Sequence, residues 1–227
     1  MKEFSPGWRM TLFTATLFPI LLMLGNWQVE RGAEKRGLEN KYLAQLAGLP
    51  AKPSLAALSV PFKTIRLNGV YEPEYFLLDN QIHDGNVGYW VIQAFLDEDH
   101  GRFLINRGFV AGSRDRSELP VVSVPVGKRS PIATVWPDLG LIPILEDTPW
   151  EEQWPKQVQR LEIDRMAELV DAYPVELRLE AGQFGALVAA PFAQVFSDAT
   201  HKGYALTWFG LSITLILGFI VYGFKRS

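Results

Sequence analysis

The 227-residue chain contains no cysteine, only three histidines and no long run of basic residues. The lack of cysteine excludes disulfides, thiolate catalysis and cysteine-based zinc sites. The histidines His83, His100 and His201 do not lie at a spacing suited to one metal ion, which argues against a site built from several imidazoles. The net charge of −3, without a cluster of Lys or Arg, gives no electrostatic basis for binding nucleic acid. We therefore expect no nucleic-acid partner.

Charge is absent from two long segments of the chain, residues 10–29 and residues 203–224. A helix of twenty residues is about 30 Å long, which matches the hydrocarbon thickness of a bilayer. The pattern therefore predicts two transmembrane helices, with Trp208 and Tyr222 as anchors at the interface. A cleaved signal peptide is the alternative for the first segment. However, Gly25-Asn26-Trp27 stands where a small-x-small cleavage site is expected.

Two spans would place residues 1–9 and 225–227 on one side of the membrane and residues 30–202 on the other. Basic residues flank both sides, and the positive-inside rule weakens for loops longer than about 60 residues, so charge alone does not orient the chain. Small residues recur every four positions in the second segment, at Gly210, Thr214 and Gly218. This spacing predicts a close-packing face, for which the first span is the candidate partner.

The segment between the spans has the pattern of a folded domain. The first helix is expected to continue beyond the membrane, because Leu38, Tyr42 and Leu46 recur at helical spacing before Gly48 and Pro50 end the pattern. Runs of β-branched and aromatic residues between turn signals predict six strands, and helical spacing predicts one short helix. The strands are expected at 62–71, 75–82, 88–96, 103–110, 131–136 and 175–180, with a loop at 112–130 and the helix at 163–173. The predicted fold class is an α+β membrane protein in which two terminal helices enclose a mainly antiparallel β domain.

A catalytic site is not indicated by the sequence. His83 stands beside Asp84, and His100 follows Asp99, but both pairs fall in turn signals between predicted strands. Side chains of adjacent residues point apart, so His83 and Asp84 are not expected to act as a proton relay. The sequence also has no nucleophile elbow, no phosphate-binding glycine loop and no HExxH motif. We therefore expect a protein that is not an enzyme.

His201 differs from the other histidines because it stands at the start of the second apolar segment. On a helix, Tyr204, Ala205 and Trp208 follow it at positions that share its face. One imidazole, one small residue and two aromatic rings form a surface against which a flat apolar macrocycle can lie, and the imidazole can supply an axial nitrogen to iron. The alternative is that His201 is an amphipathic residue placed at the membrane interface.

Several short motifs occur in an order that is typical of one family. They are LGNWQVER at 24–31 with Lys35 and Leu38, Gly69, GYWV at 88–91, LINRGFV at 104–110 and HxxYAxTWF at 201–209. With these motifs the chain resembles the Surfeit locus protein 1 family over nearly its whole length. The NRGFV and HxxYAxTWF segments are the specific signals. The family usually has Asn before this histidine and Leu after it, whereas Thr200 and Lys202 flank it here.

Proteins of this family are assembly factors of haem–copper cytochrome c oxidases. The resemblance implies a bacterial inner-membrane protein with a periplasmic central domain and cytoplasmic termini. It also implies transient binding of haem a, with His201 as an axial ligand of the iron and Tyr204 and Trp208 against the ring. A propionate would pair with Arg31, Lys202 or Arg107. The implied partners are the catalytic subunit of the oxidase, the machinery that makes haem a, and the lipid bilayer.

Two other functions stay open at this point. The chain could be a scaffold that holds the oxidase subunit during assembly without binding haem. It could also tether to the membrane a domain that binds a small solute or catalyses a reaction. The last function would require a deep polar pocket with a cluster of titratable groups.

Overall fold

The computed structural model describes residues 3–113, 118–138, 150–188 and 196–225. The chain folds as two units, one made of Met1–Asn40 together with Phe192–Ser227 and the other of Lys41–Pro191. We call the first the helical unit and the second the sheet domain. The helical unit contains most of α1 (Trp8–Leu46) and all of α5 (Ala199–Lys225).

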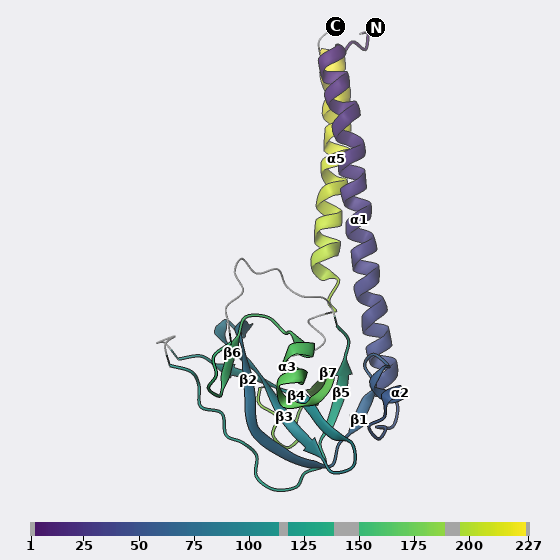
Figure 1. The fold of residues 1–227 in the computed structure, drawn as a ribbon. Helices are drawn as coiled ribbons and strands as arrows, with labels where there is room; N and C mark the ends of the chain where they lie inside the picture. The colour runs from purple at the N-terminus through teal and green to yellow at the C-terminus, as the bar shows by residue number, and fades with distance from the viewer. Residues whose placement is uncertain (1–2, 114–117, 139–149, 189–195, 226–227) are drawn as a thin grey trace. The chain divides into compact units, whose positions relative to one another are not determined.

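The two helices run side by side in opposite directions, and both chain termini lie at the same end of the pair (Figure 1). Near that end the N–H of Ser5 donates to the carbonyl of Gly223 at 3.1 Å. Both helices are long and apolar enough to cross a membrane. α1 continues without interruption past residue 29 to Leu46, which confirms the predicted extension of the first helix.

The helices pack along a seam of mostly small and polar residues. Buried residues recur on α1 at helical spacing, at Thr14, Leu21, Gly25, Gln28 and Gly32. On α5 the buried residues are Ala205, Ser212 and Gly223. A Cβ at Gly25 would lie 2.5 Å from the ring of Phe209, so this ring fills the notch that the glycine leaves.

The prediction that α1 packs on the small residues of α5 is wrong. Apart from the backbone of α5 itself, no atom of the described chain lies within 4 Å of a Cβ built at Gly210 or Gly218. Thr214 is exposed. The close approach instead occurs at Gly25 of α1, where the ring of Phe209 of α5 fills the space that a side chain would occupy. A small residue is needed on one helix at such a contact, and spacing alone does not tell which helix supplies it.

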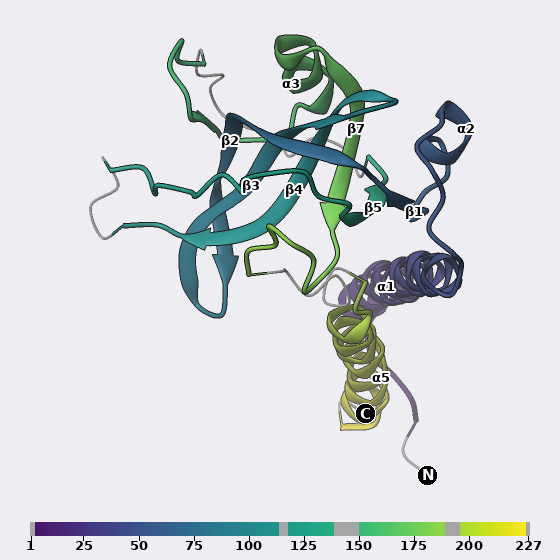
Figure 2. The ribbon, with the colours of Figure 1, turned by 90° about the horizontal axis from the view of Figure 1, so that it is seen from below.

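The sheet domain is built on a mixed seven-stranded sheet in the order β1-β5-β7-β4-β3-β2-β6 (Figure 2). Four pairs of neighbouring strands are antiparallel, whereas β2 with β6 and β4 with β7 are parallel. The antiparallel meander expected at the centre is present as β2, β3 and β4. The strands are β1 (Thr64–Arg66), β2 (Gly69–His83), β3 (Asn86–Asp97), β4 (Gly101–Ala111), β5 (Ile132–Trp136), β6 (Lys156–Val158) and β7 (Ala172–Leu179).

The elements differ from those expected at three places. The helix expected at 163–173 ends at Val170, because Asp171 has φ of +55° and Ala172 already begins β7. The run at 62–71 is divided, because Leu67 and Asn68 separate β1 from β2, and these two strands lie far apart in the sheet order. The break expected between 71 and 75 is instead a bulge inside β2, where the pairing jumps from Tyr71 with Phe95 to Tyr75 with Gln93. Pro73 is tolerated there because a bulge leaves a residue without a ladder hydrogen bond.

Apolar side chains cover both faces of the sheet. The short helix α3 (Ile163–Val170) packs Met166 and Ala167 against Phe76, Ile92 and Leu104 on one face. The other face carries a cluster that includes Ile65, Phe95, Phe103 and Leu177, with α2 (Leu55–Leu58) at its margin. Each fully buried side chain of this size stabilises the fold by about 1.5–3 kcal/mol, so β3 and β4, buried on both faces, form the rigid centre of the domain.

Gly69 gives a direct test of this arrangement. It exchanges backbone hydrogen bonds with Arg129 at 2.9 and 2.7 Å and pairs with Asp97 on its other side. A Cβ at this position would lie 1.8 Å from the carbonyl oxygen of Leu96, which cannot rotate away. We expect Gly69→Ala to lower the free energy of unfolding by about 3 kcal/mol, as for severe overpacking. Thermal unfolding of the full chain in detergent, followed by circular dichroism, measures the loss.

The matched control for that substitution is Gly37→Ala. A Cβ at Gly37, on α1, meets no atom of the described chain within 4 Å. Alanine is favoured over glycine inside a helix by about 1 kcal/mol, so this variant is expected to unfold at the same temperature as the wild type or higher. Equal melting temperatures for the two variants would contradict the packing described at Gly69.

Candidate functional site

His201 lies in the first turn of α5 and contacts α1. Its Nδ1 lies 2.8 Å from Oε1 of Gln28, a side chain that is 9% exposed. Gly32 follows Gln28 by one turn, and a Cβ there would lie 3.6 Å from the Cβ atoms of both His201 and Asp198. The two helices therefore lie close at this turn, and a methyl group at Gly32 would make only ordinary van der Waals contact with α5.

The hydrogen bond with Gln28 determines which nitrogen of His201 is available. The amide oxygen only accepts hydrogen bonds, so Nδ1 is the donor in this contact, and in the neutral tautomer that makes it the lone pair is on Nε2. In the described part of the chain no group hydrogen-bonds to Nε2, and the side chain is partly exposed. A histidine that binds a metal through one nitrogen commonly donates from the other to an oxygen. The arrangement of His201 therefore suits one axial imidazole ligand of a haem iron, bound through Nε2.

The two aromatic residues predicted beside His201 lie at the edge of the seam. Tyr204 is 55% exposed, and Trp208 is partly buried. Ala205 is buried instead. The stripe therefore divides, because Ala205 is buried in the helix pair while Tyr204 and Trp208 keep exposed surface. An exposed flanking surface is the arrangement that a flat apolar guest requires.

Lys202 and Arg31 already have carboxylate partners. The ammonium group of Lys202 lies 2.8 Å from Asp198, which also contacts Arg36 at 2.5 Å. Hydrogen bonds from Lys202 and Arg36 hold the pKa of the Asp198 carboxyl below its usual range. Arg31 pairs with Glu34 at 2.7 Å. A propionate bound by Lys202 or Arg31 would therefore compete with these carboxylates, and this role stays a prediction.

An apolar groove of about 450 Å³ lies farther along the helix pair. Phe209 lines the end of the groove that is nearer to His201 in sequence. Ile213 stands nine residues after Tyr204, so helical geometry places the two on opposite sides of α5. Ser212, which also lines the groove, stands eleven residues after His201 and four after Trp208, so helical geometry places part of the lining on the face of these two residues. The residues that line the groove are Phe18, Leu22, Phe209, Ser212, Ile213, Ile216 and Leu217.

Comparison with known sequences agrees with the motifs at these positions. The profile of the SURF1 family, the Surfeit locus protein 1 family named above, matches residues 15–213. The chain belongs to the SURF1 family. It is 26% identical to a SURF1-like protein of Rickettsia felis over 90% of this chain and 92% of that protein. SURF1-like proteins of Rickettsia conorii and Dictyostelium discoideum are 24% and 23% identical, over 90% and 93% of this chain and 87% and 94% of theirs.

The NRGFV segment of this SURF1 chain has a structural role. Asn106 donates to Glu176 at 2.8 Å, and its side-chain oxygen accepts from the N–H of Gly108 at 3.1 Å. Gly108 has φ of +111° at a bulge in β4, with the carbonyl of Val188 only 2.6 Å from where a Cβ would be. These contacts explain the glycine and the asparagine through the fold of the strand.

Arg107 of the same segment is 4% exposed and lies inside the sheet domain. Its guanidinium group donates to the side-chain oxygen of Gln93 and to the carbonyls of Ser123 and Gly185. Burial lowers the pKa of this group. The three acceptors tie β3 and two loops to β4. Arg107 thus serves the fold, in contrast to the propionate contact considered for it from the sequence.

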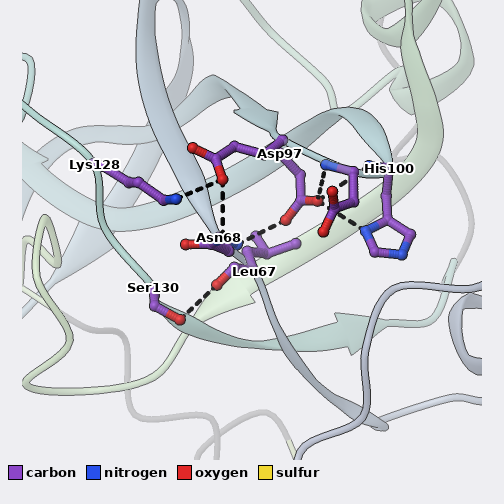
Figure 3. Close-up of polar contacts among 8 residues, drawn as sticks. Leu67, Asn68, Asp97, His100, Lys128 and Ser130 are labelled. Carbon is purple, nitrogen blue, oxygen red and sulfur yellow. Dashed lines mark hydrogen bonds and ion pairs between the residues drawn. The ribbon is translucent and has the colours of Figure 1, made fainter.

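A polar cluster at the end of β3 is likewise explained by the fold. Asp97 is 3% exposed, and its carboxylate accepts from the N–H groups of Asn68, Asp99 and His100 and contacts Nδ1 of His100 at 2.8 Å (Figure 3). Beside it, Glu98 pairs with Lys128 at 2.5 Å. The carboxylate fixes the turn between β3 and β4, which agrees with the turn role expected for His100.

His83 and Asp84 differ from the expectation that they point apart. Nε2 of His83 lies 3.4 Å from the carboxylate of Asp84. Asp84 has φ of +47° and Gly85 has φ of +77°, so the chain reverses here in a tight hairpin that brings neighbouring side chains together. The carboxylate is 82% exposed, which is typical of a solvated turn.

The sequence analysis did not identify Gln28 as a partner of His201. Its only signal was its place in the LGNWQ motif.

Proposed function

We propose that this chain is a membrane-anchored assembly factor for haem–copper cytochrome c oxidase that binds haem a transiently and passes it to the catalytic subunit. α1 and α5 would anchor it in a bacterial inner membrane, with the sheet domain in the periplasm. Membership of the SURF1 family, known for oxidase assembly, supports the first half of this proposal. The observation that carries the second half is the hydrogen bond between His201 and Gln28.

In the proposed site His201 would hold the cargo through Nε2, and Tyr204 and Trp208 would support one side of the macrocycle. Haem a brings the iron and an apolar ring, and this chain supplies one imidazole at the end of an apolar helix pair. A carrier must bind its cargo moderately, because it has to release it. One imidazole without a second strong protein ligand meets that requirement better than two imidazoles would.

The anchored helix pair also fits the chemistry of the cargo. Haem a is poorly soluble in water and carries a long apolar tail, so a carrier that keeps its ligand beside the lipid avoids moving apolar surface through water. His201 stands at the beginning of a helix long enough to cross a membrane. The paired charges of Arg36, Asp198 and Lys202 lie next to it and would remain at the polar boundary.

The test compares two measurements in cells that make haem a. The full chain, purified in detergent, is expected to show the absorption bands of bound haem a. Cells that lack the chain are expected to contain less haem a in their oxidase. If the purified protein carries no haem while the oxidase still loses it, the chain is a scaffold instead. If both measurements are unaffected, assembly is not its function.

A further inference from the structure

We infer that Gln28 is a positioning residue for the haem ligand, acting through the tautomer and donor strength of His201. This inference rests on the proposed function, because it assigns a role within the same site. The geometry behind it is the 2.8 Å contact between Oε1 of Gln28 and Nδ1 of His201, which joins residues 173 positions apart in the chain. The contact lies within the helical unit, between α1 and α5.

The position of His201 beside α1 is fixed by groups that do not depend on Gln28. Asp198 binds Arg36 of α1 at 2.5 Å and Lys202 of α5 at 2.8 Å, which fixes the first turn of α5 beside α1. The two helices also lie close at Gly32, where a Cβ would be 3.6 Å from the Cβ of His201. These contacts bring His201 to α1, but they leave its ring able to turn and its proton able to sit on either nitrogen. The hydrogen bond with Gln28 fixes both the orientation of the ring and the nitrogen that carries its proton.

The choice of an amide, rather than a carboxylate, has a consequence for transfer. A carboxylate accepting from Nδ1 makes the imidazole more basic and strengthens its bond to a metal. An amide oxygen orients the ring equally well but draws the proton less strongly. Gln28 therefore presents Nε2 in a fixed direction while keeping the ligand weak enough to release its cargo.

The first experiment uses the protein without haem. The full chain is labelled with ¹⁵N-histidine, placed in detergent micelles, and its ring nitrogens are observed by NMR at a pH where His201 is neutral. In the wild type His201 is expected in the Nδ1-protonated form. In Gln28→Leu it is expected to shift toward a mixture of both forms. Asn26→Leu, which removes an exposed amide from the same helix, is the control and is expected to match the wild type.

The second experiment adds haem a to the same proteins and measures its rate of dissociation. Loss of an oxygen partner behind a metal-binding histidine typically weakens metal affinity by 10- to 100-fold, so Gln28→Leu is expected to release haem faster by about that factor. Gln28→Glu is expected to release it more slowly than the wild type. The vibration of the bond between iron and imidazole, measured by resonance Raman, should move to lower frequency in the first variant and higher in the second.

The outcomes separate this inference from the proposed function. If wild-type His201 carries its proton on Nε2, or if Gln28→Leu leaves the tautomer unchanged, the inference is overturned whether or not haem binds. If the tautomers behave as expected and haem a does not bind the wild type, the proposed function fails while the role of Gln28 in orienting the ring is supported. Circular dichroism checks that each variant keeps its helices, and Gln28→Glu provides a polar variant should Gln28→Leu fail to fold.

Discussion

Purified from cells that make haem a, the variant His201→Ala is expected to lose the haem absorption bands that the wild type shows. The substitution removes the imidazole next to Tyr204 and Trp208, and the other two histidines, His83 and His100, lie in turns of the sheet domain where each contacts a carboxylate. The expected loss is nearly complete, because stacking on two partly exposed rings does not replace an axial ligand. Haem per protein, measured from the optical spectrum, gives the result.

Two further samples separate ligation from folding. His100→Ala removes an imidazole from a turn of the sheet domain and is expected to keep full haem occupancy. His201→Gly with added imidazole tests whether the ligand alone is missing, since a small imidazole can enter the space left by the side chain. Recovery of the haem bands in that sample would support ligation at this position. Full occupancy in His201→Ala would show that the iron is not held there.

The sequence predicts the helices of this protein better than the contacts between them. A run without charge reveals α5 because every position of such a helix faces an apolar environment. It does not reveal which face meets α1. That face is decided by the insertion of Phe209 at Gly25 and by the pairing of Gln28 with His201, and both contacts join distant parts of the chain. The small residues Gly210 and Gly218 have the expected spacing, but no side chain in the described residues packs against them.

The sheet shows the same limit. Alternation and turn residues predict β2, β3 and β4, whose antiparallel pairing follows from short hairpins. One strand, β6, and one pairing, that of β7 with β4, escaped this logic. β6 has three residues, too few for a pattern, and β7 joins β4 in parallel, a pairing that needs a long connection. The propionate contact predicted for Arg107 has the same origin. Nothing in its own segment of the sequence shows that Ser123 and Gly185, which are distant in the chain, accept its hydrogen bonds.

The variant Arg107→Leu is expected to be strongly destabilised. It keeps most of the buried volume but leaves Gln93, Ser123 and Gly185 without their donor. The buried oxygen of Gln93 costs about 1–3 kcal/mol when left unpaired, and the carbonyls of Ser123 and Gly185, which are less buried, cost less, so we expect a total loss of about 3 kcal/mol. For a chain of this size that lowers the melting temperature by about 6–12 °C.

Thermal unfolding of the full chain in detergent measures this loss, with Arg66→Leu, an exposed arginine on β1, as the control. Arg107→Lys distinguishes the two contributions of the side chain. Lysine restores a charge but not the planar fork that reaches three acceptors at once, so it should recover less than half of the lost stability. If Arg107→Leu and Arg66→Leu unfold at the same temperature, the buried guanidinium does not hold these loops to the sheet. A ligand for that charge would then have to be sought instead.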